Sequence, residues 1–197
     1  MKIRTLTLAT GVLAAALVLA GCSTTGDTGM EGMDHGSSSS PADDSSNAEF
    51  NDADVNFAMG MAVHHKQAIE MSETLLAKDG IDERVAALAE DIKAAQAPEI
   101  QTMNTWLEEW GADTEMGGMD HGGMMSEDDM AALEQATGPE ASSLFLEQMI
   151  EHHEGAIQMA QGELDTGTNA DALDLAQKIV DDQNAEIAEM QQLLDTL

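Results

Sequence analysis

The sequence predicts an all-α protein, a four-helix bundle built from two repeated helix hairpins. Apolar residues recur at alternating steps of three and four, the spacing of a helix face that packs inside a bundle. The pattern of the first hairpin returns 87 to 88 residues later. With three Phe, two Trp and no Tyr, the core must be built from Leu, Ile, Ala and Met, which suits helices better than sheets.

The N-terminal residues have the composition of an export signal. Two basic residues precede an apolar run over residues 6–20, and a Leu-Ala-Gly-Cys sequence ends at Cys22. The run is too short to favour a membrane span, and the four-residue sequence is typical of a lipobox. We therefore expect residues 1–21 to be a signal peptide and Cys22 to be lipidated. An ordinary signal peptide with an incidental cysteine is the alternative.

The chain expected after cleavage is strongly acidic. Residues 1–21 hold two of the seven basic residues and no acidic one, which leaves 38 acidic against five basic residues, a net charge of −33. This balance excludes nucleic acid as a partner. It is typical of a solvated surface and would also concentrate cations. Because Cys22 is the only cysteine, no disulfide can form within one chain.

A tether and the first hairpin are predicted next. Residues 22–49 are rich in Ser, Gly, Thr and Asp, so we expect a flexible tether between the lipid anchor and the domain. The first hairpin is predicted over residues 50–110. Its helices run over about 51–78 and 82–110, and an Asp-Gly pair marks the turn between them.

A connector with a short helix joins this hairpin to the second one. The connector is predicted over residues 111–138, where Ser-Glu-Asp-Asp from residue 126 is a capping box that opens a short helix. The second hairpin is predicted over residues 139–197, with helices at about 139–164 and 170–194. Since one hairpin cannot bury its apolar face alone, the two copies are expected to pair about a pseudo-twofold axis.

The first helix of each hairpin carries paired histidines flanked by methionines. At 100° per residue, His64 lies about 20° from Met71 and His65 about 40° from Met61, so two His–Met rows border one helix face. Imidazole and thioether together suit monovalent copper better than they suit calcium, magnesium or manganese. The sequence therefore indicates a metal site whose candidate ligands are Met61, His64, His65, Met71, Met149, His152, His153 and Met159.

The second helix of each hairpin places polar groups where Leu or Ile would be expected. Such groups are costly on a core face unless they have partners. From these positions we add two glutamates and two methionines to the candidate ligands: Glu99, Met103, Glu186 and Met190. The alternatives stay open at this point, namely methionines that only fill the core, histidines satisfied by hydrogen bonds, and glutamates that bond between helices or face solvent.

Two further segments share the sequence Gly-Met-Asp-His-Gly. One lies in the tether and the other in the connector, and Met/His tracts of this kind need no packed core to wrap a soft ion. Low-complexity linker sequence is the alternative. We expect a secondary, flexible metal tract formed by Met30, Met33, His35, Met116, Met119, His121, Met124 and Met125.

The doubled Met-x-x-His-His-x-x-Ala-x-x-Met motif, at residues 61–71 and 149–159, resembles the domain of unknown function 305 family. The partner helices are similar too, in Gln-x-x-Glu-Ile-x-x-Met from residues 96 and 183. The resemblance covers about residues 50–197 and implies a ferritin-like four-helix bundle with extracytoplasmic copper handling. The second copy departs from the first where Leu193 replaces Trp106 and Ala185 faces Pro98.

The main hypothesis is an exported, membrane-anchored lipoprotein that sequesters, stores or transfers a soft metal. Copper is favoured, in its monovalent state; silver is a further candidate, and iron is less favoured. Expected partners are the metal ion, the membrane through the lipid anchor, and a protein that donates or accepts copper; an oligomer is also compatible with the sequence. The alternative is a ferritin-like redox enzyme with Glu99 and Glu186 as ligands. The Glu-x-x-His spacing of di-iron bundles is absent, which favours a binder over an enzyme.

Overall fold

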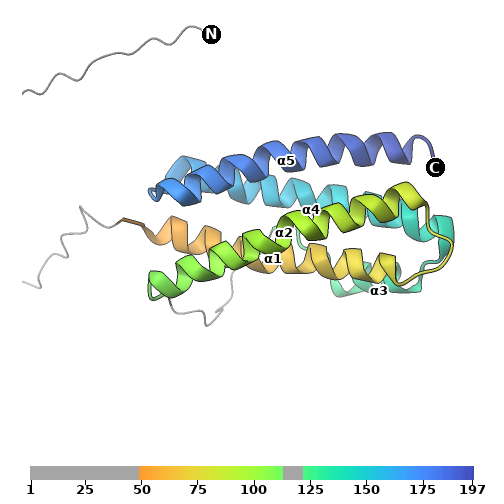
Figure 1. Ribbon diagram of the computed structural model, residues 1–197, viewed down its shortest axis with the longest axis horizontal. Coiled ribbons are helices and arrows are strands. Elements are labelled where there is room, and N and C mark those ends of the chain that lie inside the picture. Colours follow the sequence, from red (N-terminus) through yellow and green to blue (C-terminus); the bar gives the residue numbers. More distant parts are fainter. Residues whose placement is uncertain (1–48, 113–121) are drawn as a thin grey trace, which may run out of the picture. The chain divides into compact units, whose positions relative to one another are not determined.

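The computed structural model describes residues 49–112 and 122–197, which form four long helices and one short helix (Figure 1). This arrangement confirms the all-α prediction. The expected signal peptide, the lipidation site and nearly all of the tether lie outside the described residues. The helices are α1 (Asp52–Leu76), α2 (Glu83–Glu109), α3 (Glu127–Gln135), α4 (Gly138–Thr166) and α5 (Ala170–Leu194).

The helices begin where the sequence supplies caps. The Asn51 side chain accepts hydrogen bonds from the first turn of α1, and the Asn51 N–H donates in turn to the Asp54 carboxylate. Ser126 and Asp129 form the predicted capping box of α3. Asn169 caps α5 through a bond from the Ala172 N–H. Each cap satisfies backbone donors that a helix start leaves without partners.

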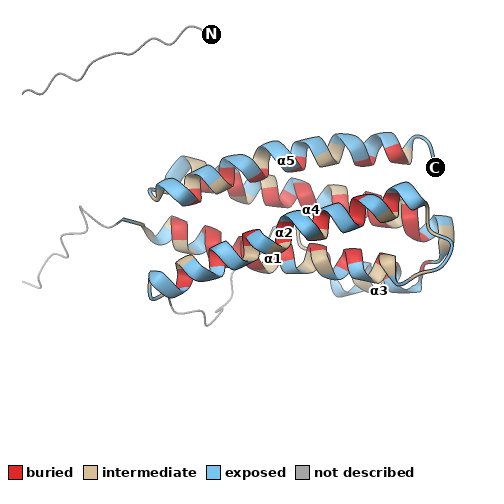
Figure 2. Ribbon diagram, in the orientation of Figure 1, coloured by how far each residue is buried: buried red, intermediate tan, exposed pale blue. Residues whose placement is uncertain are grey.

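The two hairpins meet through their first helices. Helix α1 packs along α2, α4 packs along α5, and the main contact between the hairpins is that of α1 with α4. Buried residues line the inner faces of all four long helices, while the outer faces of α2 and α5 are exposed (Figure 2). Because α1 and α4 are in the middle of the arrangement, the residues that they turn inward are the most deeply enclosed.

At each end of the bundle, a loop N–H donates a hydrogen bond to the start of a helix in the other hairpin. The acceptor is a hydroxyl at one end and a carboxylate at the other. At one end, the Asp82 N–H in the α1–α2 loop donates to Ser142 Oγ at 2.9 Å. At the other end, the Asn169 N–H in the α4–α5 loop donates to Asp54 Oδ1 at 2.8 Å, and Thr168 adds two further donors to the same carboxylate. Positions 82 and 169 correspond in the repeat, as do 54 and 142.

A second carboxyl group, that of Glu163, lies against Asp54. Burial and the hydrogen bond to Asp54 raise the pKa of Glu163 to about 8, so this side chain keeps its proton at neutral pH. Burial would raise the pKa of Asp54 too, but its bonds from Glu163 and the loop N–H groups outweigh burial and lower that pKa. The pair therefore shares one proton, held on Glu163. The corresponding residue of the first repeat is Leu75, which is buried in the core.

An aromatic stack lies at this same end. The Phe50 ring stacks on Trp110 with centroids 5.0 Å apart, and Trp110 stacks on Trp106 at 5.8 Å. Asn51 Nδ2 also donates to the Thr166 carbonyl, at 2.9 Å. The start of α1 is thus fixed both to the end of α2 and to the end of α4.

The connector is held against the bundle by two different devices. Gln67 Nε2 donates to the Met125 carbonyl at 2.9 Å, and the Met125 N–H donates to Gln67 Oε1 at 2.7 Å. At the corresponding position of the second repeat, Gly155 lets the backbone of Gly123 approach so closely that a Cβ on Gly155 would lie 2.5 Å from the Gly123 Cα. The first repeat therefore holds the connector through side-chain hydrogen bonds, whereas the second holds it through close backbone packing at a residue without a side chain.

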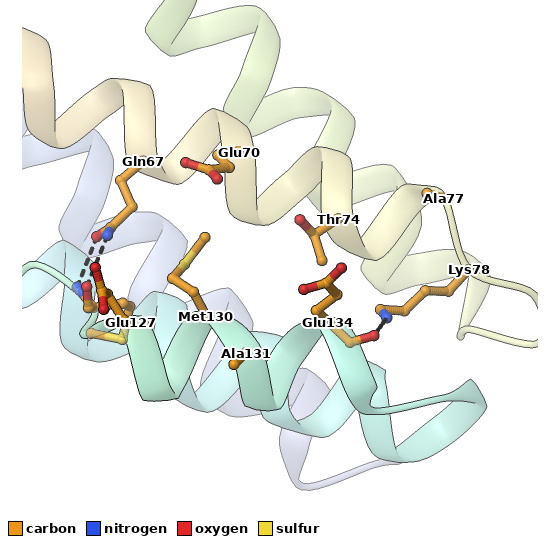
Figure 3. A pocket seen from close by; sticks show the side chains of 10 residues that line it. Gln67, Glu70, Thr74, Ala77, Lys78, Glu127, Met130, Ala131 and Glu134 are labelled. Atoms are coloured by element: carbon orange, nitrogen blue, oxygen red, sulfur yellow. Dashed lines mark hydrogen bonds between the residues drawn. The ribbon is translucent and has the colours of Figure 1, made fainter.

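A groove of about 730 Å³ lies between α1 and α3, beside the Gln67 contact (Figure 3). Glu70 borders it on α1, and Met130 and Glu134 border it on α3. Lys78 Nζ closes its far end by donating to the Glu134 carbonyl at 2.7 Å. The groove belongs to the outer face of α1, whereas the paired histidines predicted to bind metal lie on its inner face.

Candidate metal centre

The four motif histidines form the centre of the bundle. His64 and His65 on α1 and His152 and His153 on α4 are all fully buried. The His64 and His152 rings lie face to face across the two repeats, with centroids 3.7 Å apart and planes tilted by 36°. The predicted motif residues of separate hairpins are thus brought together, as the pseudo-twofold pairing of α1 with α4 requires.

Burial favours the neutral form of two of these histidines, His65 and His152. It lowers the pKa of His65, against the opposing effect of the nearby Glu99 carboxylate. It lowers the pKa of His152 further, since the neighbouring His64 and His153 would repel a positive charge there. A neutral imidazole has one nitrogen lone pair available for a metal ion, so burial favours the ligand form of the side chain.

Two of the histidines are oriented by carboxylates. His65 Nε2 lies 2.8 Å from Glu99 Oε2, and His153 Nε2 lies 2.6 Å from Glu186 Oε2. The sequence left open whether the glutamates bind metal or bond between helices; here each occupies a histidine Nε2. In a neutral ring this nitrogen carries the proton, so the lone pair is on Nδ1. Both Nδ1 atoms are buried without a hydrogen-bond partner.

The methionines gather in two groups that combine the repeats. Met71 of the first repeat belongs to the same apolar cluster as Met149 and Met190 of the second. Met61 and Met103 belong to the other cluster, against which Met159 packs, partly buried. Each cluster therefore brings together methionines from both hairpins. Spacing along a single helix does not reveal this arrangement.

Lys178 contacts the candidate metal centre, and the sequence did not predict this contact. Its Nζ donates to Glu99 Oε1 at 2.8 Å and to Asp182 at 2.6 Å. Burial alone would raise the pKa of Glu99, but the bonds that Glu99 accepts from His65 and Lys178 outweigh burial and lower it. The one available signal was the repeat itself, because Lys178 stands where the first copy has Asp91.

A small polar cleft opens between α2 and α5, bordered by both histidine-bound glutamates. Two further lining residues, Gln96 and Gln183, are also equivalent in the repeat. Both are almost fully buried, with 3% and 4% of their surface exposed. The cleft gives the α2–α5 side of the centre an oxygen-rich border, in contrast to the thioether-containing clusters within the bundle.

The predicted flexible tract is described only in part. Met124 is half-buried and Met125 is buried in the cluster that contains Met71. The six other predicted residues lie outside the described residues: Met30, Met33, His35, Met116, Met119 and His121.

The carboxylate-rich alternative has no assembled site in the described parts of the chain. Within residues 49–112 and 122–197, no group of three or more His, Asp or Glu side chains is arranged to hold a metal ion.

Comparison with known proteins places this architecture in a family. The sequence profile of a domain of unknown function, DUF305, matches residues 54–194. The chain belongs to the DUF305 family. None of the curated proteins compared with the chain matches it. Within residues 49–112 and 122–197, no helix is long and apolar enough to cross a membrane.

Solved structures agree with this membership. A DUF305 protein from Streptomyces coelicolor is 36% identical, covers 73% of this chain and 91% of its own, and has a TM-score of 0.69. A DUF305 fragment from Deinococcus radiodurans is 30% identical, with 75% and 98% covered and a TM-score of 0.68. The Cu(I)-bound form of CopM is 30% identical, with 73% and 96% covered and a TM-score of 0.62. CopM also has Cu(II)-bound and Ag-bound structures.

Proposed function

We propose that this protein binds a soft transition metal ion outside the cytoplasm, with monovalent copper preferred and silver accepted, to sequester, store or transfer it. The observation that carries the proposal is the pair of buried Nδ1 atoms on His65 and His153, each without a protein partner. A buried polar atom with no partner costs free energy in the metal-free protein, on the order of 1 to 3 kcal/mol. A bound ion would recover that cost.

The groups around these nitrogens favour a soft ion. Glu99 and Glu186 fix the ring orientation of the two histidines, the arrangement that carboxylates commonly provide beside metal-bound imidazoles. Methionines from both repeats lie in the adjoining clusters, and thioethers select monovalent copper over hard cations. The similarity to CopM, whose structures contain copper and silver, supports the same choice of metal.

The location proposed for this activity is the outer side of the cytoplasmic membrane or the cell envelope. Lipidation of Cys22 would attach the domain there through residues 22–49. Thioether ligands suit such an oxidising compartment, because they do not form disulfides. A partner protein would donate copper to this domain or accept copper from it.

A competition titration with Cu⁺ against a chromophoric chelator, under anaerobic conditions, tests the proposal. The protein used in this titration is the mature chain with the substitution Cys22→Ser, which removes its only thiol. Replacing Met61, Met71, Met149 and Met159 together by Leu preserves apolar volume and removes four thioethers. We expect the affinity to fall at least about tenfold, or roughly 1.4 kcal/mol.

The matched control replaces Met59 and Met130 by Leu, since both are methionines in the described helices and neither belongs to the motif. Affinity and stoichiometry should stay at the wild-type value in this control. Equal Cu⁺ binding by the quadruple variant and the control would contradict the proposed centre, and absence of any competitive Cu⁺ binding would contradict the function.

A further inference from the structure

The cleft between α2 and α5 contains polar groups that the soft-metal centre does not use. Its polar border consists of Gln96 and Glu99 on α2 and of Asp182, Gln183 and Glu186 on α5. Asp182 is already bonded by the Lys178 ammonium. The space that the cleft encloses is that of about one water molecule. The cleft is therefore too narrow for an organic ligand, and it fits a water molecule or a single ion.

The two glutamines are costly where they lie. Neither Gln96 Oε1 nor Gln183 Oε1 has a hydrogen-bond partner, and Gln96 Nε2 also has none. Leu or Met in their place would bury the same volume without that cost. Their side chains line the cleft from opposite hairpins, so two amide oxygens without partners are available to one occupant.

The pseudo-twofold symmetry indicates what that occupant is. On the Glu99 side, His65 uses one carboxylate oxygen, and the other, Oε1, accepts a hydrogen bond from the Lys178 ammonium at 2.8 Å. On the Glu186 side, the residue corresponding to Lys178 is Asp91, which is acidic. In the described ranges, His153 is the one residue that forms an ion pair with Glu186, and it uses Oε2. Within the described ranges, the ammonium that Lys178 supplies to Glu99 thus has no counterpart beside Glu186.

We propose that this cleft binds one hard divalent cation, distinct from the soft ion of the histidine–methionine centre. Its protein ligands would be Glu186 Oε1 and the amide oxygens of Gln96 and Gln183, and water would complete the coordination. Carboxylate and amide oxygens with retained water are the ligands of hard divalent ions. The charge also fits. One ammonium, that of Lys178, pairs with both Glu99 and Asp182. Within residues 49–112 and 122–197, no Lys or Arg pairs with Glu186 or Asp91.

Titration with Mn²⁺, followed by the loss of the EPR signal of the free ion, tests the site. Mn²⁺ is a suitable probe because it prefers oxygen ligands to thioethers. Replacing Gln96 and Gln183 by Met keeps their volume and removes both amide oxygens. Asp91→Lys supplies the ammonium that the first half already has. We expect wild type to bind one more equivalent of Mn²⁺ than either variant, at equal ionic strength.

Gln101→Met combined with Gln191→Met is the matched control, since both residues are exposed glutamines on the same two helices. This control should keep the extra equivalent. Asp91 is exposed, so the Asp91→Lys variant keeps the test valid if the buried double variant fails to fold. Equal Mn²⁺ binding in wild type and the Asp91→Lys variant overturns the site. Ag⁺ stoichiometry, measured on the same samples, reports separately on the soft-metal centre.

Discussion

The two repeats keep the same groups at the centre of the bundle and differ in the charges around it. Each supplies two buried histidines and one histidine–glutamate bond. Lys178 neutralises Glu99, whereas Asp91 occupies the equivalent position for Glu186. The comparison shows that the imidazoles persist in both copies while the electrostatic surroundings have diverged, so the two halves of the centre are chemically unequal.

The ends of the bundle differ in the same way. Ser142 and Leu75 close one end with a neutral hydroxyl and an apolar side chain, while Asp54 and Glu163 close the other with two carboxyl groups. The Ser142–Leu75 pair contains no titratable group, whereas the Asp54–Glu163 pair depends on a shared proton and is therefore sensitive to pH. The second difference therefore predicts that one end alone weakens as pH rises.

The largest effect is expected from Glu163→Gln, which makes the second end neutral as well. The folded-state pKa of Glu163 is about 8, above its ordinary value of 4.5. Its contribution to stability is thus fully present below pH 4.5 and is lost as pH rises to about 8. Gln retains a donor for Asp54 without titrating. At pH 9 the variant should be more stable than wild type by a few kcal/mol, on the order given by the pKa shift.

Urea denaturation at a series of pH values between 5 and 9 measures this difference. The two proteins should be nearly equal near pH 5 and diverge as pH rises. Asp54 has a lowered pKa, so its own contribution is lost only in acid and does not disturb this range. Parallel stability curves across the whole range would show that Glu163 holds no proton in the folded protein.

A smaller effect is expected where the repeats hold the connector differently. Gly155→Ala forces a Cβ to within 2.5 Å of the Gly123 backbone, which cannot yield as a flexible side chain would. We expect a loss of roughly 1 to 3 kcal/mol. Gln67→Leu removes two hydrogen bonds to Met125 and should cost about 1 to 2 kcal/mol.

The control is Gly162→Ala, in the same helix as Gly155. An added Cβ there meets no atom within 4 Å, so Ala should stabilise α4 by roughly 0.5 to 1 kcal/mol. The free energies of unfolding of all three variants, measured in urea, give the comparison. Stabilisation by Gly155→Ala would mean that the connector does not rest on α4 in solution.

The smallest effect on stability is expected from Lys178→Met, which makes the halves of the centre more alike. The lysine side chain is 54% exposed, and ion pairs of that kind contribute under about 1 kcal/mol. Lys93→Met, which removes longer surface ion pairs of 3.6 and 3.9 Å, is the control. A loss well above 1 kcal/mol for Lys178→Met alone would show that Glu99 depends on the lysine far more than its exposure indicates.

The sequence predicted the helices well because their signals are local. Ser126 opens the short helix through the predicted capping box, and the predicted ends of the helices agree with the structure to within about two residues. The meeting of His64 with His152 was also predictable, because the duplicated motif implies a pseudo-twofold axis. These features depend on periodicity and repetition, which one sequence contains.

The rest of the candidate site depends on which side chains meet across helices. Spacing along α1 places Met61 and Met71 on one helix, but packing assigns them to different clusters. The bond from Lys178 to Glu99 joins α5 to α2, between residues 79 positions apart. Charge alone could not distinguish Lys178 from the other basic residues, because Lys178 and Glu99 come close only when the two hairpins have packed together.

The aromatic stack of Phe50, Trp106 and Trp110 determines which part of this protein its intrinsic fluorescence monitors. Both tryptophans of the chain lie in that stack, and there is no tyrosine. Ultraviolet-excited emission therefore comes from one end of the bundle, next to the Asp54–Glu163 pair and away from the neutral end. A fluorescence-detected melting curve follows the opening of that end, whereas circular dichroism at 222 nm follows all the helices. Disagreement between the two signals would locate the first part of the molecule to open.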